Sequence, residues 1–228
     1  AQSLGQSHVR EDLPDGTWED ERAIGMRSPC LLQNSEGACR QRHDVRTFHL
    51  HALGDSGGRM DIMVRCMRAA LLVADGIRRD TVLDLLLLAG ADSPLAVRLS
   101  GESIRFLRPD ERRNAILLQE ALATWHPGKE MTHLAPGIEA RPGGLEEWLC
   151  RNHGENLFYL DSGGPDIRSV GLVDGGVTFV VGDDRGLTQE QREILVRHKV
   201  QPLGLGPVSV HTEDAITLVH NELDRRWL

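Results

Sequence analysis

The run Val-Leu-Asp-Leu-Leu-Leu-Leu-Ala-Gly at residues 82–90 limits the possible folds more than any other part of this chain. It is almost continuously apolar and has the length of a strand, which is typical of strands covered on both faces of a sheet. No apolar run in the sequence approaches the roughly 20 residues that a membrane-spanning helix needs. The run therefore predicts a buried strand with helices on both sides of its sheet.

Other segments alternate between strand and helix patterns along the chain. Strands are expected at residues 46–53, 82–90, 156–161, 176–181 and 202–205. Helices are expected at residues 57–76, 109–122, 145–150, 188–199 and 213–226. Two of these helices have clear start signals, because Pro109 precedes two acidic residues and Thr188 can act as an N-terminal cap. The alternation predicts an α/β fold with a doubly wound, mostly parallel sheet and helices on both faces.

Residues 1–45 differ from the rest of the 228-residue sequence. They are polar and show no sustained periodicity, which predicts a poorly ordered N-terminal extension before a single domain at residues 46–228. The first residues lack the apolar stretch of a secretory signal, and the four cysteines are scattered, as in reduced cytoplasmic proteins. The spacing of Cys30 and Cys39 fits no common zinc pattern, so no metal is expected. The sequence thus predicts a cytoplasmic protein.

The charge balance limits how the protein can bind nucleic acid. The formal net charge is −8, which argues against a surface that binds nucleic acid all over. The cations are almost all arginine, since Lys129 and Lys199 are the only lysines. A local arginine patch remains possible on such a chain.

Three expected strands end in glycine-containing loops within the last third of the chain, at residues 161–164, 182–186 and 204–207. Ligands of parallel sheets bind beyond the carboxyl ends of the strands, and glycines let the backbone approach a ligand closely. The loops match neither the dinucleotide fingerprint nor a phosphate-binding P-loop. Neutral backbone and apolar side chains suit adenosine on a sulfonium better than a triphosphate. Ordinary surface turns are the alternative interpretation.

Five segments resemble one family in order and spacing. They are GGRMDIMVRCMRAALLVADGIRRDT, LRPDERR, VVGDDRGLTQEQ, LGLGPVSVH and AITLVHNELDRR. Together they resemble the TrmY-type tRNA pseudouridine-N1 methyltransferases of the SPOUT superfamily, from about Arg46 to Trp227. The resemblance implies S-adenosylmethionine (SAM) as cofactor, a C-terminal trefoil knot and a homodimer. It also implies tRNA as substrate, modified at position 54 in the T-loop.

The resemblance also assigns cofactor contacts. They fall on Leu160, Gly182, Leu205, Gly206, Pro207, Val208, Ser209, Val210 and Ala215. Family members usually carry cysteine where this chain has Ala215, a change that a contact through the backbone alone would tolerate. A second departure is the short segment between Leu53 and Gly57, where relatives usually have a longer loop.

Asp61 and Arg59 are the candidate catalytic residues. Pseudouridine has an N1–H group that uridine lacks, and a carboxylate within hydrogen-bond reach could polarise it or accept its proton. Asp61 lies in the first turn of an expected helix, and Arg59 would contact phosphate or base beside it. The structural alternative is a helix-end charge, or an ion pair of Asp61 with Arg65 four residues later.

Arginines in the matched motifs are the candidate RNA contacts. They are Arg65, Arg78, Arg79, Arg108, Arg112 and Arg113. Arginines on one surface could hold an RNA backbone around a splayed-out base, although each alone could be a solvated helix end. The rival functions are the same chemistry on another RNA such as ribosomal RNA, and a knotted RNA-binding protein without activity.

Overall fold

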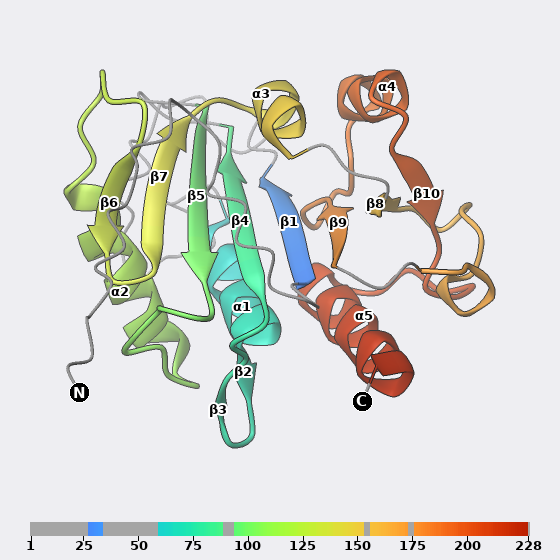
Figure 1. Ribbon diagram of the computed structural model, residues 1–228, viewed down its shortest axis with the longest axis horizontal. Coiled ribbons are helices and arrows are strands. Elements are labelled where there is room, and N and C mark those ends of the chain that lie inside the picture. Colours follow the sequence, from blue (N-terminus) through green and yellow to red (C-terminus); the bar gives the residue numbers. More distant parts are fainter. Residues whose placement is uncertain (1–26, 34–58, 89–93, 153–155, 173–175, 228) are drawn as a thin grey trace, which may run out of the picture.

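A computed structural model describes residues 27–33, 59–88, 94–152, 156–172 and 176–227. These residues form an eight-stranded sheet in the order β10-β8-β9-β1-β4-β5-β7-β6, with helices packed against it (Figure 1). The strands of the sheet are β1 (Arg27–Gln33), β4 (Val82–Leu87), β5 (Leu95–Ser100), β6 (Thr132–Ala135), β7 (Ile138–Pro142), β8 (Leu157–Leu160), β9 (Val177–Val181) and β10 (Gln201–Leu203). The helices are α1 (Met60–Leu71), α2 (Glu111–Ala123), α3 (Leu145–Arg151), α4 (Gln189–Arg197) and α5 (Thr212–Trp227), with a short 3₁₀ turn at Ile167–Ser169.

The sheet is mixed, so the prediction of a mostly parallel sheet is not confirmed. The strands β10, β8, β9, β1 and β4 run parallel to one another, whereas β5, β7 and β6 add antiparallel pairings. Short connections explain two of the three antiparallel pairings, because only Pro136 and Gly137 separate β6 from β7 and only residues 88–94 separate β4 from β5. A parallel crossover needs about a dozen residues or more.

Helices cover both faces of the sheet, as the apolar run at residues 82–90 predicts. One core cluster holds buried residues of α1, α2 and α5 together with Leu83, Leu85 and Leu87 of β4. The opposite cluster holds buried residues of α3 and α4 together with Leu86. All six residues of β4 are buried.

The one charged residue of β4 is buried with partners. Asp84 accepts hydrogen bonds from Arg98 Nε and Nη2, both at 2.7 Å, and from the indole Nε1 of Trp148 at 3.0 Å. Because both carboxylate oxygens are paired, the cost of burying the charge is offset. Asp84 thus has a structural role on the face that α3 covers.

Helix boundaries differ from the sequence prediction at two places. Helix α1 ends at Leu71 instead of residue 76, and the chain continues as a hairpin of β2 (Leu72–Val73) and β3 (Gly76–Ile77). Helix α2 is capped by the Asp110 side chain, which accepts from Arg113 N at 2.8 Å, so Pro109 lies just before the cap. The predicted cap at Thr188 is confirmed, with a reciprocal bond from Gln191.

Strand β1 comes from within residues 1–45, the segment expected to be an extension. It lies in the centre of the sheet and pairs in parallel with β4 and β9. The predicted strand at 46–53 and the short segment between Leu53 and Gly57 lie outside the described residues. The division into an extension and a domain at residue 46 therefore stays a prediction.

Candidate active site

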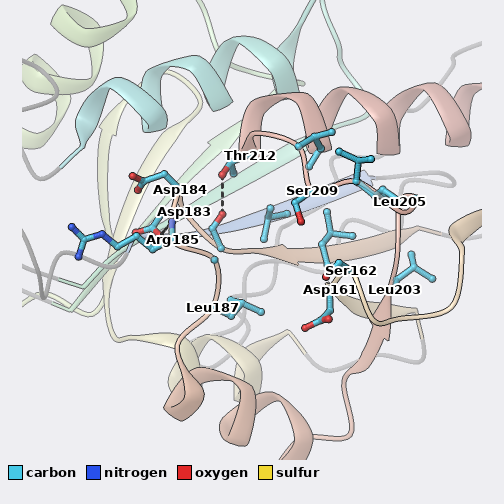
Figure 2. A pocket seen from close by; sticks show the side chains of 18 of the residues that line it. Asp161, Ser162, Asp183, Asp184, Arg185, Leu187, Leu203, Leu205, Ser209 and Thr212 are labelled. Atoms are coloured by element: carbon cyan, nitrogen blue, oxygen red, sulfur yellow. Dashed lines mark hydrogen bonds between the residues drawn. The ribbon is translucent and has the colours of Figure 1, made fainter.

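A cavity of about 310 Å³ opens beyond the carboxyl ends of three neighbouring parallel strands, β8, β9 and β10 (Figure 2). This is the end of a parallel sheet at which ligands bind. The volume is at the lower end of the range for small-molecule pockets, roughly 300–1,000 Å³. The cavity is thus formed by the three loops that the sequence analysis singled out.

Most of the predicted cofactor residues line this one cavity. The lining includes Leu160, Gly182, Leu205, Gly206, Val208, Ser209, Val210 and Ala215. The ninth predicted residue, Pro207, is not among the lining residues. Other lining side chains belong to two of the predicted loops but were not predicted as cofactor contacts: Asp161, Ser162, Asp183, Asp184 and Arg185. The remaining side chains of the lining lie outside those loops: Val181, Leu187, Arg192, Leu203 and Thr212. The wall is therefore apolar on one part and polar on another, which fits a nucleoside better than a purely apolar ligand.

Two of the loops are joined directly through their backbones. Asp161 N donates to Leu203 O at 3.0 Å, and Gly204 N donates to Pro165 O at 2.7 Å. A Cβ atom placed on Gly164 would lie only 2.7 Å from Leu203 N, so glycine is required for the loops to meet. Gly164 and Gly204 are thus explained by contact between loops, without a ligand.

Gly206 is different, because its φ of +140° is unfavourable for residues with a side chain and a Cβ added there would meet only open space. The backbone at Gly206 can therefore approach a bound molecule, as the sequence analysis expected of these glycines. The loop at Gly182 is tied to α5 instead, since the buried Thr212 hydroxyl donates to Gly182 O at 3.1 Å (Figure 2). This hydroxyl therefore joins a cavity loop to the start of α5.

A cluster of charged side chains connects the cavity to the start of α1. Arg59 Nε donates to Asp61 Oδ1 at 3.1 Å, and Arg65 Nη2 donates to Asp61 Oδ2 at 3.0 Å. Arg59 Nη1 also donates to Asp184 Oδ2 at 2.5 Å, and Arg65 Nε donates to Glu213 Oε1 at 2.7 Å. Asp184 itself lines the cavity. The predicted catalytic pair therefore lies one side chain away from the predicted cofactor residues.

The environment of Asp61 keeps its carboxyl ionised. Burial acts to raise the pKa of Asp61, but the hydrogen bond and charge of Arg59 and the charge of Arg65 outweigh it, leaving the pKa below its ordinary value of 3.8. Arg59 holds this position with a left-handed backbone, at φ 67°. Such strain in a residue with a side chain is frequent at functional sites. Asp61 can thus accept a hydrogen bond at neutral pH.

The six predicted RNA contacts separate into two groups. Arg65, Arg78 and Arg79 have partners within the protein: Arg78 forms two bonds with Asp224, at 2.9 and 3.0 Å, and Arg79 donates to backbone carbonyls at residues 101–104. The other three are exposed on the segment that leads into α2 and on its first turn, and they are Arg108, Arg112 and Arg113. The exposed group is therefore the better candidate for direct contact with phosphates.

Sequence reasoning missed two partners in this site. Asp184 was part of a quoted motif, but its ion pair with Arg59 spans 125 positions and has no local signal. The cavity residue Asp161 forms an ion pair with Arg192 of α4. The helical periodicity indicates only that Arg192 lies on the surface. Among the described residues, no group of three or more metal-binding side chains comes together, and none of the helices could span a membrane.

The fold and the cavity define a class: an α/β protein with a small-molecule pocket formed by strand-end loops, beside an arginine–carboxylate cluster. Residues 40–228 match a family model described as "Putative SAM-dependent RNA methyltransferase". The match covers most of the chain, so the chain belongs to this family.

Named relatives agree with this assignment. The tRNA (pseudouridine(54)-N(1))-methyltransferase of Methanosarcina mazei is 39% identical over 186 residues, which cover 80% of this chain and 88% of the relative. The enzyme of the same name from Methanopyrus kandleri is 38% identical over 167 residues, which cover 73% of this chain and 80% of the relative. Among solved structures, Archaeoglobus fulgidus Nep1 bound to S-adenosylhomocysteine superposes with a TM-score of 0.57 over 89% of this chain and 98% of that chain. At 17% identity this last likeness shows the fold alone.

Proposed function

We propose that this protein transfers the methyl group of SAM to N1 of pseudouridine in tRNA, at position 54 of the T-loop. The supporting observation is that the predicted cofactor cavity lies beside the predicted catalytic pair. Eight of the nine predicted cofactor residues line one cavity, and Asp184 of that cavity holds Arg59 beside Asp61. The relatives are named for this activity, and the alignment with this chain covers most of their length.

The loops suit the adenosine part of SAM. Leu160 and Leu205 offer apolar surface for a purine, and the open backbone at Gly206 can approach its polar edge. Ala215 lies in the same lining and is 6% exposed, so the residue that departs from the family pattern still contributes to the wall. The carboxylates of the cavity lining are those of Asp161, Asp183 and Asp184.

SAM, when bound, supplies a methyl group that its sulfonium has already activated. The remaining tasks are to orient the base and to manage one proton. Asp61 accepts the hydrogen bond of N1–H, and Arg59 orients the base or its phosphate. Bound SAM would supply the methyl carbon for the new bond to N1, with its sulfur as the leaving group, and the Asp61 carboxylate or solvent would take the N1 proton. The lowered pKa of Asp61 favours a role as acceptor and orienting group over that of a strong base.

The finer architecture belongs to the same proposal. We infer a C-terminal trefoil knot, an exception to the rule that chains do not thread their own loops. Its support is the close crossing of residues 161–167 with residues 203–204, where glycines lack room for a side chain.

We also infer a homodimer, supported by exposed apolar side chains next to the cavity at Val208 and Val210 and on α5 at Leu218. A tRNA substrate further favours a cytoplasmic location.

The first test is calorimetric titration of the purified protein with SAM. The variant Gly206→Trp would place an indole over the cavity and is expected to abolish binding. Gly76→Trp is the matched control, because Gly76 in the β2–β3 hairpin has a similar φ of +145° and also faces open space, but it does not line the cavity. A folded wild type that binds no SAM would contradict the proposal and leave a non-catalytic RNA-binding protein.

The second test asks which RNA receives the methyl group. Labelled SAM is supplied with a tRNA that carries pseudouridine at position 54, with the same tRNA carrying uridine, and with a pseudouridine-containing ribosomal RNA fragment. The expected result is label on the first RNA alone. Label on the ribosomal fragment alone would establish the rival enzyme.

A further inference from the structure

Phe106 is an aromatic ring that the fold leaves in solvent. Its side chain belongs to the segment between β5 and α2, and the residue is 71% exposed. Among the residues that the structure describes, no other phenylalanine, tyrosine or tryptophan is exposed. The mechanism proposed above gives this ring no role, and its exposure is unfavourable in water.

The ring is exposed because its backbone is held in an unusual conformation. Phe106 has a φ of 66°, in the left-handed region that residues with a side chain rarely adopt. Leu107, which follows it, and Ile104, two residues before it, are anchored in the core, at 6% and 0% exposed. Such a conformation persists only where the surroundings impose it, which is frequent at binding sites.

Two polar side chains fix the segment from either end. The Arg79 guanidinium donates to the carbonyls of Gly101 at 2.8 Å and Ile104 at 3.3 Å. The buried Asn114 of α2 holds the Arg108 backbone, accepting from its N–H at 3.0 Å and donating to its carbonyl at 2.6 Å. The segment 104–108 is therefore a fixed support for the ring. Arg79, predicted to contact RNA, instead positions the loop that carries it.

The surroundings of the ring are charged. Close to Phe106 in the sequence, the exposed cations are Arg105, Arg108, Arg112 and Arg113, and the exposed acids are Glu102, Asp110 and Glu111. One of these acids, Asp110, is engaged as the cap of α2. On a chain of net charge −8 this segment is locally cationic. A single ring among arginines is a poor surface for a protein partner, which would favour a larger apolar patch.

We propose that Phe106 is a stacking platform for one unpaired base of the RNA, with the flanking arginines on the adjacent phosphates. Single-stranded RNA is recognised by stacking its splayed bases on aromatic side chains, and arginines hold the backbone beside them. The proposal rests on the proposed function in that the partner is RNA. It adds a base-contacting residue that selects loops over duplexes.

The test compares two RNAs with each of four proteins, the wild type and three variants. The RNAs are a stem-loop with the T-arm sequence and a blunt duplex of the same stem, and the dissociation constants are measured by fluorescence anisotropy at fixed salt. Phe106→Gly removes the ring and relieves the left-handed backbone, so loss of folding does not confound it. Phe106→Tyr retains the ring. Val196→Ala is the matched control, because Val196 is 63% exposed on α4.

Phe106→Gly is expected to weaken binding of the stem-loop by about 5- to 150-fold, the range for loss of one stacked base, and to leave binding of the duplex unchanged. Phe106→Tyr and Val196→Ala should bind both RNAs like the wild type. Unchanged stem-loop binding by Phe106→Gly, or equal losses for the stem-loop and the duplex, would overturn the platform. If the ring effect is found in a protein that transfers no methyl group, the platform stands and the proposed activity fails.

Discussion

Asp61 lies between two guanidinium groups, and this placement determines how its role can be measured. Asp61→Asn keeps the shape but loses the charge that accepts N1–H, so we expect kcat to fall by about 100-fold or more while SAM binding is retained. Because the pKa of Asp61 is lowered below 3.8, the carboxylate is ionised throughout the neutral range. The wild-type rate should therefore show no Asp61-dependent decline between pH 5 and 8. A decline in that range that disappears in Asp61→Asn would contradict the assignment.

The same carboxylate contributes to stability with a defined sign. A group whose pKa is lowered in the folded state stabilises it above the ordinary value of 3.8, and this contribution is lost as the pH falls through the lower folded value. Asp61→Asn should thus remove an acid-dependent part of the unfolding free energy. Asp75→Asn, at an exposed position in the β2–β3 turn, is a suitable control for both measurements.

At the residue scale, sequence could predict the loop residues but not their long-range partners. Glycines after strands identify Gly182 and Gly206 locally, because a turn and a close approach need them. The ion pair of Arg59 with Asp184 depends on how the start of α1 meets the loop after β9, which no periodicity encodes. The left-handed conformation that exposes Phe106 likewise depends on tertiary anchors at Ile104 and Leu107.

At the scale of elements, the link between the β9 loop and α5 rests on one buried hydrogen bond. Thr212→Val keeps the volume of the side chain but leaves Gly182 O without the Thr212 donor, at a cost of about 1–3 kcal/mol in unfolding free energy. Denaturant unfolding would measure this cost, and SAM affinity should fall with it because Gly182 and Thr212 both line the cavity. Thr212→Ser retains the hydroxyl and should preserve most of both. Equal stability of the valine and serine variants would show that the bond does not hold the loop.

Element prediction succeeded where local chemistry is strong. The reciprocal cap of Thr188 and Gln191 fixes the start of α4, and the apolar run at residues 82–90 identifies β4. Sequence reasoning missed β5, β6 and β7, which form the antiparallel part of the sheet. Short connections join β4 to β5 and β6 to β7. Their pairing direction follows from connection length, which strand–helix alternation does not reveal.

At the scale of the whole molecule, the proposed dimer would cover apolar side chains that a single chain exposes. Leu218 of α5 is 41% exposed and Val208 of the cavity loop is 73% exposed. A charge placed at a covered position would be buried without a partner, which is strongly unfavourable. Leu218→Glu is therefore expected to convert a species of about twice 25.3 kDa into a monomer, as measured by sedimentation velocity.

The matched control is Val196→Glu, which places the same charge on α4 at a position that is 63% exposed. It should leave the dimer intact, because α4 packs on the face of the sheet opposite α5. If the RNA site extends across the dimer, Leu218→Glu should also lose methyl transfer at concentrations where it still binds SAM. A wild type that sediments as a single chain of 25.3 kDa with full activity would contradict the dimer and place the entire site within one chain.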